Sequence, residues 1–163
     1  LETVLVGRHP HLGRWGWESE ADEAIARAAL DEVGLAAFGE RDVLTLSGGE
    51  RQRVSVAALL TQAPRLFLLD EPTNHLDLHY QVAVLELFSR LTRAGRGVVM
   101  VLHDINLAAR FADRVILLDG RGGVAAGTRE AILQADRLSH AFAHPIRRVE
   151  VDDPDGRAVF LPR

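Results

Sequence analysis

Two adjacent acids, Asp70 and Glu71, follow the apolar residues 66–69. The continuous apolar run is typical of a strand that is buried on both faces. The acids would then lie at the carboxyl end of a parallel strand, where α/β folds bind their ligands. There Asp70 could hold Mg²⁺ through water, and Glu71 could position and polarise an attacking water molecule. The structural alternative is a strand that ends in an acidic turn, but two acids directly after such a run favour the chemical interpretation.

A second candidate site begins at Ser47, which is followed by Gly48, Gly49 and Glu50. Serine is a good N-cap, and the two glycines let another group approach the backbone closely. The free N–H groups and the dipole at the start of a helix attract anions. An ordinary capped helix is the structural alternative, because Ser-Gly-Gly is common in loops. The motif therefore gains its weight from the two acids that follow it.

Two further polar residues stand beside predicted elements. His103 comes directly after the strand predicted at residues 98–102 and would share a sheet edge with Glu71. A neutral imidazole there could hydrogen-bond a γ-phosphate or the catalytic water, although a single histidine at a strand end is more often structural. Asp77 precedes the next predicted helix, so its minimal role is that of an N-cap.

The elements that would position these residues alternate between helices and short apolar strands. Strands are predicted at residues 66–70, 98–102 and 114–118, and helices at 47–63, 79–92 and 105–112. This βαβ alternation predicts an α/β fold with a parallel sheet and flanking helices. We expect three zones: a helical subdomain at 1–45, an α/β core with the candidate site residues at 46–125, and C-terminal helices with a hairpin at 126–163.

The two outer zones have their own local signals. In the first, residues 7–17 are predicted to be a loop, and a capping box at residues 19–22 begins a helix that Gly34 ends. Ile25, Ala28, Ala29 and Leu30 would form the apolar side of that helix. In the last, residues 128–142 are predicted to form one or two short helices. A hairpin is predicted from the runs 146–151 and 157–161 around a turn at 153–156.

Composition excludes several classes of function. The net charge of −4 argues against a nucleic-acid partner, which needs a clustered basic face. The sequence contains no cysteine, so it can form no disulfide or thiolate metal site. Its longest apolar stretches are too short to cross a bilayer, so a membrane connection would run through a partner protein.

Taken together, these motifs resemble those of the ATP-binding subunits of ABC transporters, in the same order and spacing. The resemblance implies that Ser47–Glu50 is the signature motif, with glutamate in the place of the usual glutamine, and that it contacts ATP. It implies that Glu71 is the catalytic glutamate, Asp70 the Mg²⁺ ligand of the Walker B strand, and His103 the switch histidine. It identifies Asp77 as the last residue of the D-loop, which also faces the nucleotide.

The resemblance also implies partners and a location. The family works as a head-to-tail dimer, in which ATP lies between the phosphate loop of one subunit and the signature of the other. Within the family, residues 7–12, 73–77 and 102–110 resemble the ATPases of iron–siderophore, haem and vitamin B12 importers. We therefore expect ATP and Mg²⁺ as cofactors, permease subunits and indirectly a substrate-binding protein as partners, and a peripheral place at the cytoplasmic face of the membrane.

One departure from the family pattern is large. The sequence contains no lysine, so it has no G-x-x-x-x-G-K-[ST] phosphate loop. We expect a truncated chain that is inactive alone, rather than a decayed subunit, because Glu71 and His103 are both present. The alternatives are a non-catalytic module that acts through its signature face, and a soluble ABC-type ATPase acting on DNA or the ribosome. The latter usually carries long insertions or a second head, and neither is evident in the sequence.

Overall fold

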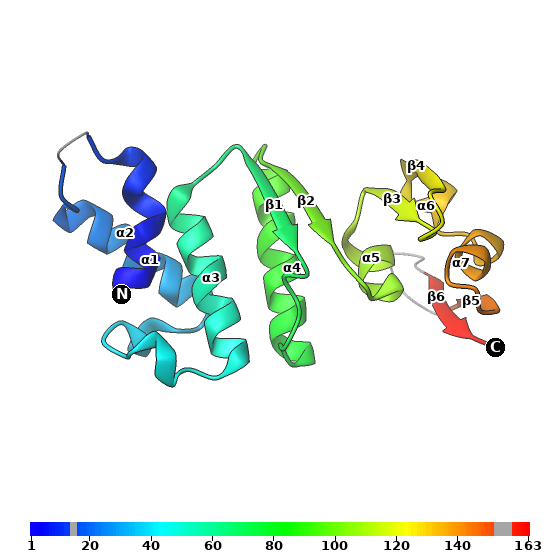
Figure 1. Cartoon of the computed structure of the whole chain (residues 1–163), viewed down its shortest axis with the longest axis horizontal. Coiled ribbons are helices and arrows are strands. Elements are labelled where there is room, and N and C mark those ends of the chain that lie inside the picture. The colour runs from blue at the N-terminus through cyan, green and yellow to red at the C-terminus, as the bar shows by residue number, and fades with distance from the viewer. Residues whose placement is uncertain (14–15, 152–157) are drawn as a thin grey trace. The chain divides into compact units, whose positions relative to one another are not determined.

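The computed structural model describes residues 1–13, 16–151 and 158–163. They form two compact units, Leu1–Val101 and Leu102–Arg163, and each is described by itself (Figure 1). Within the described ranges, no helix has the length and apolar character needed to cross a membrane.

The first unit begins with helices that pack on a long central helix. Its helical elements before the sheet are α1 (Glu2–Leu5), η1 (Val6–His11), α2 (Glu20–Glu32), η2 (Ala36–Phe38), η3 (Val43–Thr45) and α3 (Gly48–Gln62). The loop predicted from residue 7 is wrong in its first part, because residues 7–11 belong to the 3-10 helix η1. That helix is held in place by Arg8, which donates hydrogen bonds to Asp22 and to the carbonyl of Thr61.

The ends of α2 agree with the prediction, and its buried side agrees in part, since Ala29 and Leu30 are buried as predicted. Ser19 caps the helix in a capping box with Asp22, and Gly34 follows its end with a φ of +70°. The buried residues of the helix are Asp22, Ala26, Ala29 and Leu30. Ile25 and Ala28 are exposed instead. Because the paired carboxylate of Asp22 turns inward, the buried stripe includes residues 22 and 26 rather than 25 and 28.

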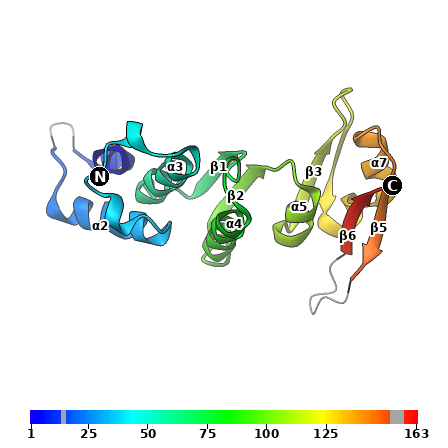
Figure 2. The same cartoon turned by 90° about the horizontal axis from the view of Figure 1, so that it is seen from below.

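A βαβ unit follows, as predicted. It consists of β1 (Leu66–Asp70), α4 (Leu78–Arg93) and β2 (Gly97–Val101), and the two strands pair in parallel. Figure 2 shows α4 nearly end-on beside the strand pair. The rings of Phe67 and Phe88 meet edge-on with their centroids 5.5 Å apart. The helix therefore covers the face of the sheet that Phe67 occupies.

The opposite face of the strand pair is exposed. Side chains alternate between the two faces of a strand, so residues 66 and 68 share a face with their register partners at 97 and 99. The exposed apolar side chains of this face are Leu66, Leu68, Val99 and Val101. The prediction that β1 is buried on both faces is thus wrong for the residues that the structure describes.

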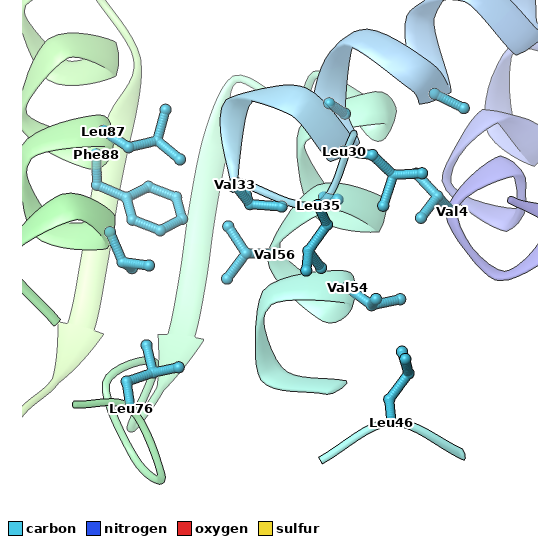
Figure 3. Close-up of a cluster of buried hydrophobic side chains, with 14 of the residues drawn as sticks. Val4, Leu30, Val33, Leu35, Leu46, Val54, Val56, Leu76, Leu87 and Phe88 are labelled. Carbon is cyan, nitrogen blue, oxygen red and sulfur yellow. The ribbon is translucent and has the colours of Figure 1, made fainter. Parts of the chain in front are cut away.

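The core of the first unit surrounds α3. Side chains from α2, α3, β1 and α4 form one apolar cluster, part of which Figure 3 shows. Leu46 and Leu76 both belong to this cluster. Leu46 directly precedes Ser47, and Leu76 directly precedes Asp77. The packing of these two leucines in the core therefore anchors the backbone beside both candidate residues.

The second unit combines short helices with two antiparallel strand pairs. Its elements are α5 (Ile105–Phe111), β3 (Arg114–Leu118), β4 (Val124–Thr128), α6 (Arg129–Ile132), α7 (Ala135–Ala141), β5 (Ile146–Glu150) and β6 (Ala158–Pro162). Pairing of β5 with β6 confirms the predicted hairpin, whose turn at 153–156 lies outside the described residues. The strand β4, which pairs with β3, was not predicted.

Candidate functional site

The N-terminal end of α3 is closed by a capping box. The Ser47 hydroxyl accepts a hydrogen bond from the Glu50 N–H at 3.2 Å, and the Glu50 carboxylate accepts one from the Ser47 N–H at 2.7 Å. The first N–H groups of a helix have no acceptor within it. Those of Gly48 and Gly49 therefore stand at an exposed, positively polarised helix end that suits an anion.

The carboxylate of Glu50 is part of this cap. Hydrogen bonds from the backbone and side chain of Ser47 lower the pKa of Glu50, and the nearby charges of Arg41 and Arg53 act in the same direction. Glutamate thus stays ionised and folded back onto the backbone of its own helix. The glutamine that usually holds this place would offer a neutral acceptor instead.

The turn between β1 and α4, residues 71–77, is anchored by buried residues of its own. Pro72, Thr73 and Leu76 are buried. Two residues of this turn adopt the left-handed conformation that favours glycine: Glu71 has a φ of +46° and His75 a φ of +61°. Such conformations cost of order 1–3 kcal/mol each and cluster at functional sites. The side chain of Asn74 donates a hydrogen bond to the Glu71 carboxylate, which fixes the orientation of that half-buried acid.

The structure brings the turn and the end of α3 together. A Cβ atom on Gly49 would lie 2.9 Å from the carbonyl oxygen of His75, closer than real Cβ contacts. The side chain of Gln52, one turn further along α3, donates to the carbonyl of Pro72 at 3.3 Å. Glycine at position 49 is therefore required by this close approach, which supplies a structural reason for the motif beside the chemical one.

Asp70 ends β1 on the open face of the strand pair. It pairs in register with Val101, is exposed, and shares its face with Leu66 and Leu68. Among the residues described, no group of three His, Cys, Asp or Glu side chains could hold a metal ion. Mg²⁺ is usually bound by one or two carboxylates together with substrate phosphates, rather than by a cage of protein ligands. A single accessible carboxylate in this place fits that kind of site.

The last two predicted site residues both lie at the ends of elements. Asp77 is the N-cap of α4, and its carboxylate accepts a hydrogen bond from the Tyr80 N–H at 3.0 Å. His103 belongs to the second unit, where it is exposed and directly precedes Asp104, the N-cap of α5. The Ser47 motif, Asp70, Glu71 and Asp77 thus all belong to the first unit. The roles predicted for these residues and for His103 stay predictions.

Sequence reasoning missed Arg53, which lies on α3 between the two motifs. Its guanidinium is buried, donates to two carbonyls after α2, and lies over the ring of Tyr80. The sequence carried one signal: an arginine three positions after Glu50 falls on the same side of the helix as the capping carboxylate. Periodicity alone does not predict that such an arginine is buried.

Comparisons with known proteins found similar sequences and folds. A family model described as ABC transporter matches residues 2–74, which contain both motifs. A hemin import ATP-binding protein of Deinococcus radiodurans is 48% identical over 152 residues, covering 90% of this chain and 57% of the relative. An iron(3+)-hydroxamate import ATP-binding protein of Bacillus subtilis is 42% identical over 142 residues, covering 86% of this chain and 53% of the relative.

A solved structure is similar over nearly the whole chain. It is an ABC transporter in an inward-facing conformation, assigned to the metal-chelate type, with a TM-score of 0.89 and 30% identity. The match covers 99% of this chain and 64% of that one. The chain therefore has the fold of an ABC transporter ATPase and is similar in sequence to the ATP-binding proteins of that family. It spans little more than half the length of the two curated relatives.

Proposed function

We propose that this chain serves in the ATP-hydrolysing subunit of an ABC importer. The observation that carries the proposal is the contact between the capped end of α3 and the turn at residues 71–77. It places an anion-attracting helix end beside the turn that holds Glu71 and Asp77. Asp70 lies at the end of the strand that leads into the same turn.

In this proposal each residue has a distinct role. Ser47, Gly48, Gly49 and Glu50 bind the phosphates of a nucleotide held by a second subunit, through the hydroxyl and the helix N–H groups. Asp70 holds Mg²⁺, which neutralises charge on the phosphates when it is bound. Glu71, oriented by Asn74, positions and deprotonates the attacking water.

Two further residues complete the proposed site. Asp77 keeps the turn in register by capping α4, and so presents the turn to the nucleotide. His103 hydrogen-bonds the γ-phosphate or the attacking water. The residues of this sequence include no lysine, so a phosphate-binding lysine would be supplied from beyond them. By themselves, we expect these 163 residues to hydrolyse ATP negligibly.

The names of the relatives support a proposal for the substrate class and the partners. Two relatives are named for hemin and iron(3+)-hydroxamate import, and a relative from Halobacterium salinarum is named for cobalamin import. We therefore propose uptake of an iron–siderophore, haem or cobalamin-type substrate. The proposed assembly is a head-to-tail pair of ATPase subunits on transmembrane permease subunits, served by a substrate-binding protein. It would lie at the cytoplasmic face of the membrane, with no nucleic-acid partner.

A second candidate is a non-catalytic module that completes a partner's site through its signature face. The absence of lysine favours it, because this chain then contributes the Ser47 motif without gripping a nucleotide of its own. The Asp70–Glu71 pair counts against it, since a module that acts only through its signature has no use for either acid.

The first test is nucleotide-dependent association. The purified chain is mixed with an intact relative whose catalytic glutamate is replaced by glutamine, and complex formation is measured by analytical ultracentrifugation with and without Mg-ATP. We expect a 1:1 complex only with Mg-ATP. Replacing Ser55, an exposed serine further along α3, by alanine is the control and should leave the complex intact. Absence of nucleotide-dependent association in the unchanged chain would overturn the proposal.

A further inference from the structure

Arg53 joins the end of α2 to the central helix. Its side chain extends from α3 and is among the few charged groups of the described chain that are buried, with 8% of the residue exposed. Nη1 donates hydrogen bonds to the carbonyls of Val33 at 3.2 Å and Gly34 at 3.3 Å. A cation is favourable there, because the carbonyls at the C-terminal end of a helix are left without intrahelical partners.

The other side of the same guanidinium faces α4. Its central carbon lies 3.8 Å from the centroid of the Tyr80 ring, a cation–π contact. Tyr80 belongs to the first turn of α4, and its N–H is the group that Asp77 caps. The ring also lies close to the end of α2, since a Cβ atom on Gly34 would be 3.7 Å from Tyr80 Cε1.

One side chain thus connects three elements. A planar guanidinium can donate in its plane while its face stacks on an aromatic ring, and a lysine ammonium cannot do both. The Nε atom of Arg53 has no hydrogen-bond partner in the parts of the chain that the structure describes. The burial of Arg53 therefore does not serve to give every donor a hydrogen bond. Instead, the buried guanidinium links the end of α2 to α4.

We propose that Arg53 is a positioning residue that couples the end of α2 to the first turn of α4. A displacement of α2 would move the guanidinium, the Tyr80 ring and the Asp77 cap together. The turn at residues 71–77 would then shift against Gly49. The coupling itself stands on this geometry alone, and only its consequence for nucleotide engagement rests on the proposed function.

The test compares variants of the 163-residue chain. Arg53→Met removes the link, Tyr80→Leu removes the ring, and Tyr80→Phe keeps the ring without its hydroxyl. Arg8→Met is the matched control, because Arg8 is also a largely buried arginine of this unit but joins η1 to α2 and α3 instead. Hydrogen–deuterium exchange is measured at residues 33–35 and 77–81, together with Mg-ATP-dependent association with the intact relative.

We expect Arg53→Met to speed exchange at both segments at least tenfold and to weaken association at least tenfold. Tyr80→Leu should do the same, and Tyr80→Phe should rescue both readouts. Arg8→Met should leave exchange at 77–81 and association unchanged, even at a matched loss of thermal stability. Faster exchange that stays confined to residues 33–35 in Arg53→Met, or an equal effect of Arg8→Met at 77–81, would overturn the coupling. If the unchanged chain does not associate, the proposed function fails, and the exchange result still decides the coupling.

Discussion

Two of the long helices of the first unit, α2 and α3, begin with the same local motif in different surroundings. At α2, Ser19 and Asp22 form the capping box, and the buried carboxylate of Asp22 also pairs with Arg8 at 2.8 Å. At α3, Ser47 and Glu50 form an equivalent box at an exposed helix end. At the first helix start the capping carboxylate is buried and paired with Arg8, whereas the second helix start lies beside a strained turn.

The comparison teaches that a capping box is not a binding site by itself. Both helix ends carry the same unsatisfied N–H groups and the same dipole. Two features distinguish the second helix end. Gly48 and Gly49 carry no side chain that would block the backbone, and the turn that contains Glu71 packs directly on Gly49. Alanine substitutions at the two caps should therefore rank in one order by their effect on association and in the reverse order by their effect on stability.

The largest expected difference concerns association. Ser47→Ala removes the hydroxyl that would contact the partner's nucleotide, so we expect Mg-ATP-dependent association with an intact relative to weaken at least tenfold. Ser19→Ala leaves the exposed helix end untouched and should associate like the unchanged chain. The measurement is a dissociation constant from sedimentation or fluorescence titration. Equal weakening by both substitutions would show that the two caps do not differ in function.

Stability should show the reverse order. Loss of an N-cap costs about 0.5–2 kcal/mol of unfolding free energy. Ser19→Ala should lie at the upper end of that range, because its hydroxyl also donates to the Asp22 carboxylate at 2.7 Å. Ser47→Ala should lie at the lower end. Urea unfolding of both variants, followed by circular dichroism, gives the two values, and a larger loss for Ser47→Ala would contradict this ranking.

A smaller difference is expected in the dependence of stability on pH. Hydrogen bonds from Ser19, first through its side chain, and from Arg8 hold the pKa of Asp22 well below its usual range. A carboxyl group with a depressed folded-state pKa contributes stability above its unfolded pKa of about 3.9, and this contribution is lost as the pH falls below that value. Asp22→Asn should therefore flatten the fall in unfolding free energy between about pH 5 and pH 2. Glu50→Gln should flatten it less, and equal slopes for the unchanged chain and Asp22→Asn would refute the assignment.

Several features of the fold were predictable because they are local. Capping boxes involve residues three positions apart, so the starts of α2 and α3 could be read from the sequence. The same holds for β1, whose apolar run ends at Asp70. By contrast, β4 has the sequence Val-Ala-Ala-Gly-Thr, and its alanines and glycine have low strand propensity. Its existence depends on pairing with β3, which no local pattern encodes.

The candidate site divides in the same way. The residue types of Asp70, Glu71 and Ser47 indicated chemistry, and the order of the elements placed the acids at a strand end. The contact of Gly49 with His75 and the burial of Arg53 between α2 and α4 are tertiary facts. They depend on how three helices meet around one core, which spacing along the chain does not determine.

Measurement of ATP turnover tests the catalytic role proposed for Glu71. The chain is joined to an upstream segment that supplies a phosphate-binding loop, and Mg-dependent ATP hydrolysis is measured for three versions: unchanged, Glu71→Gln, and Glu86→Gln. Glu86 is an exposed glutamate of α4 and serves as the matched control. Removing a general base costs about 10²–10⁴-fold in rate. We predict a loss of that size for Glu71→Gln with ATP binding preserved and an ATP-bound dimer accumulating, and no change for Glu86→Gln. Near-normal turnover by Glu71→Gln would contradict the account.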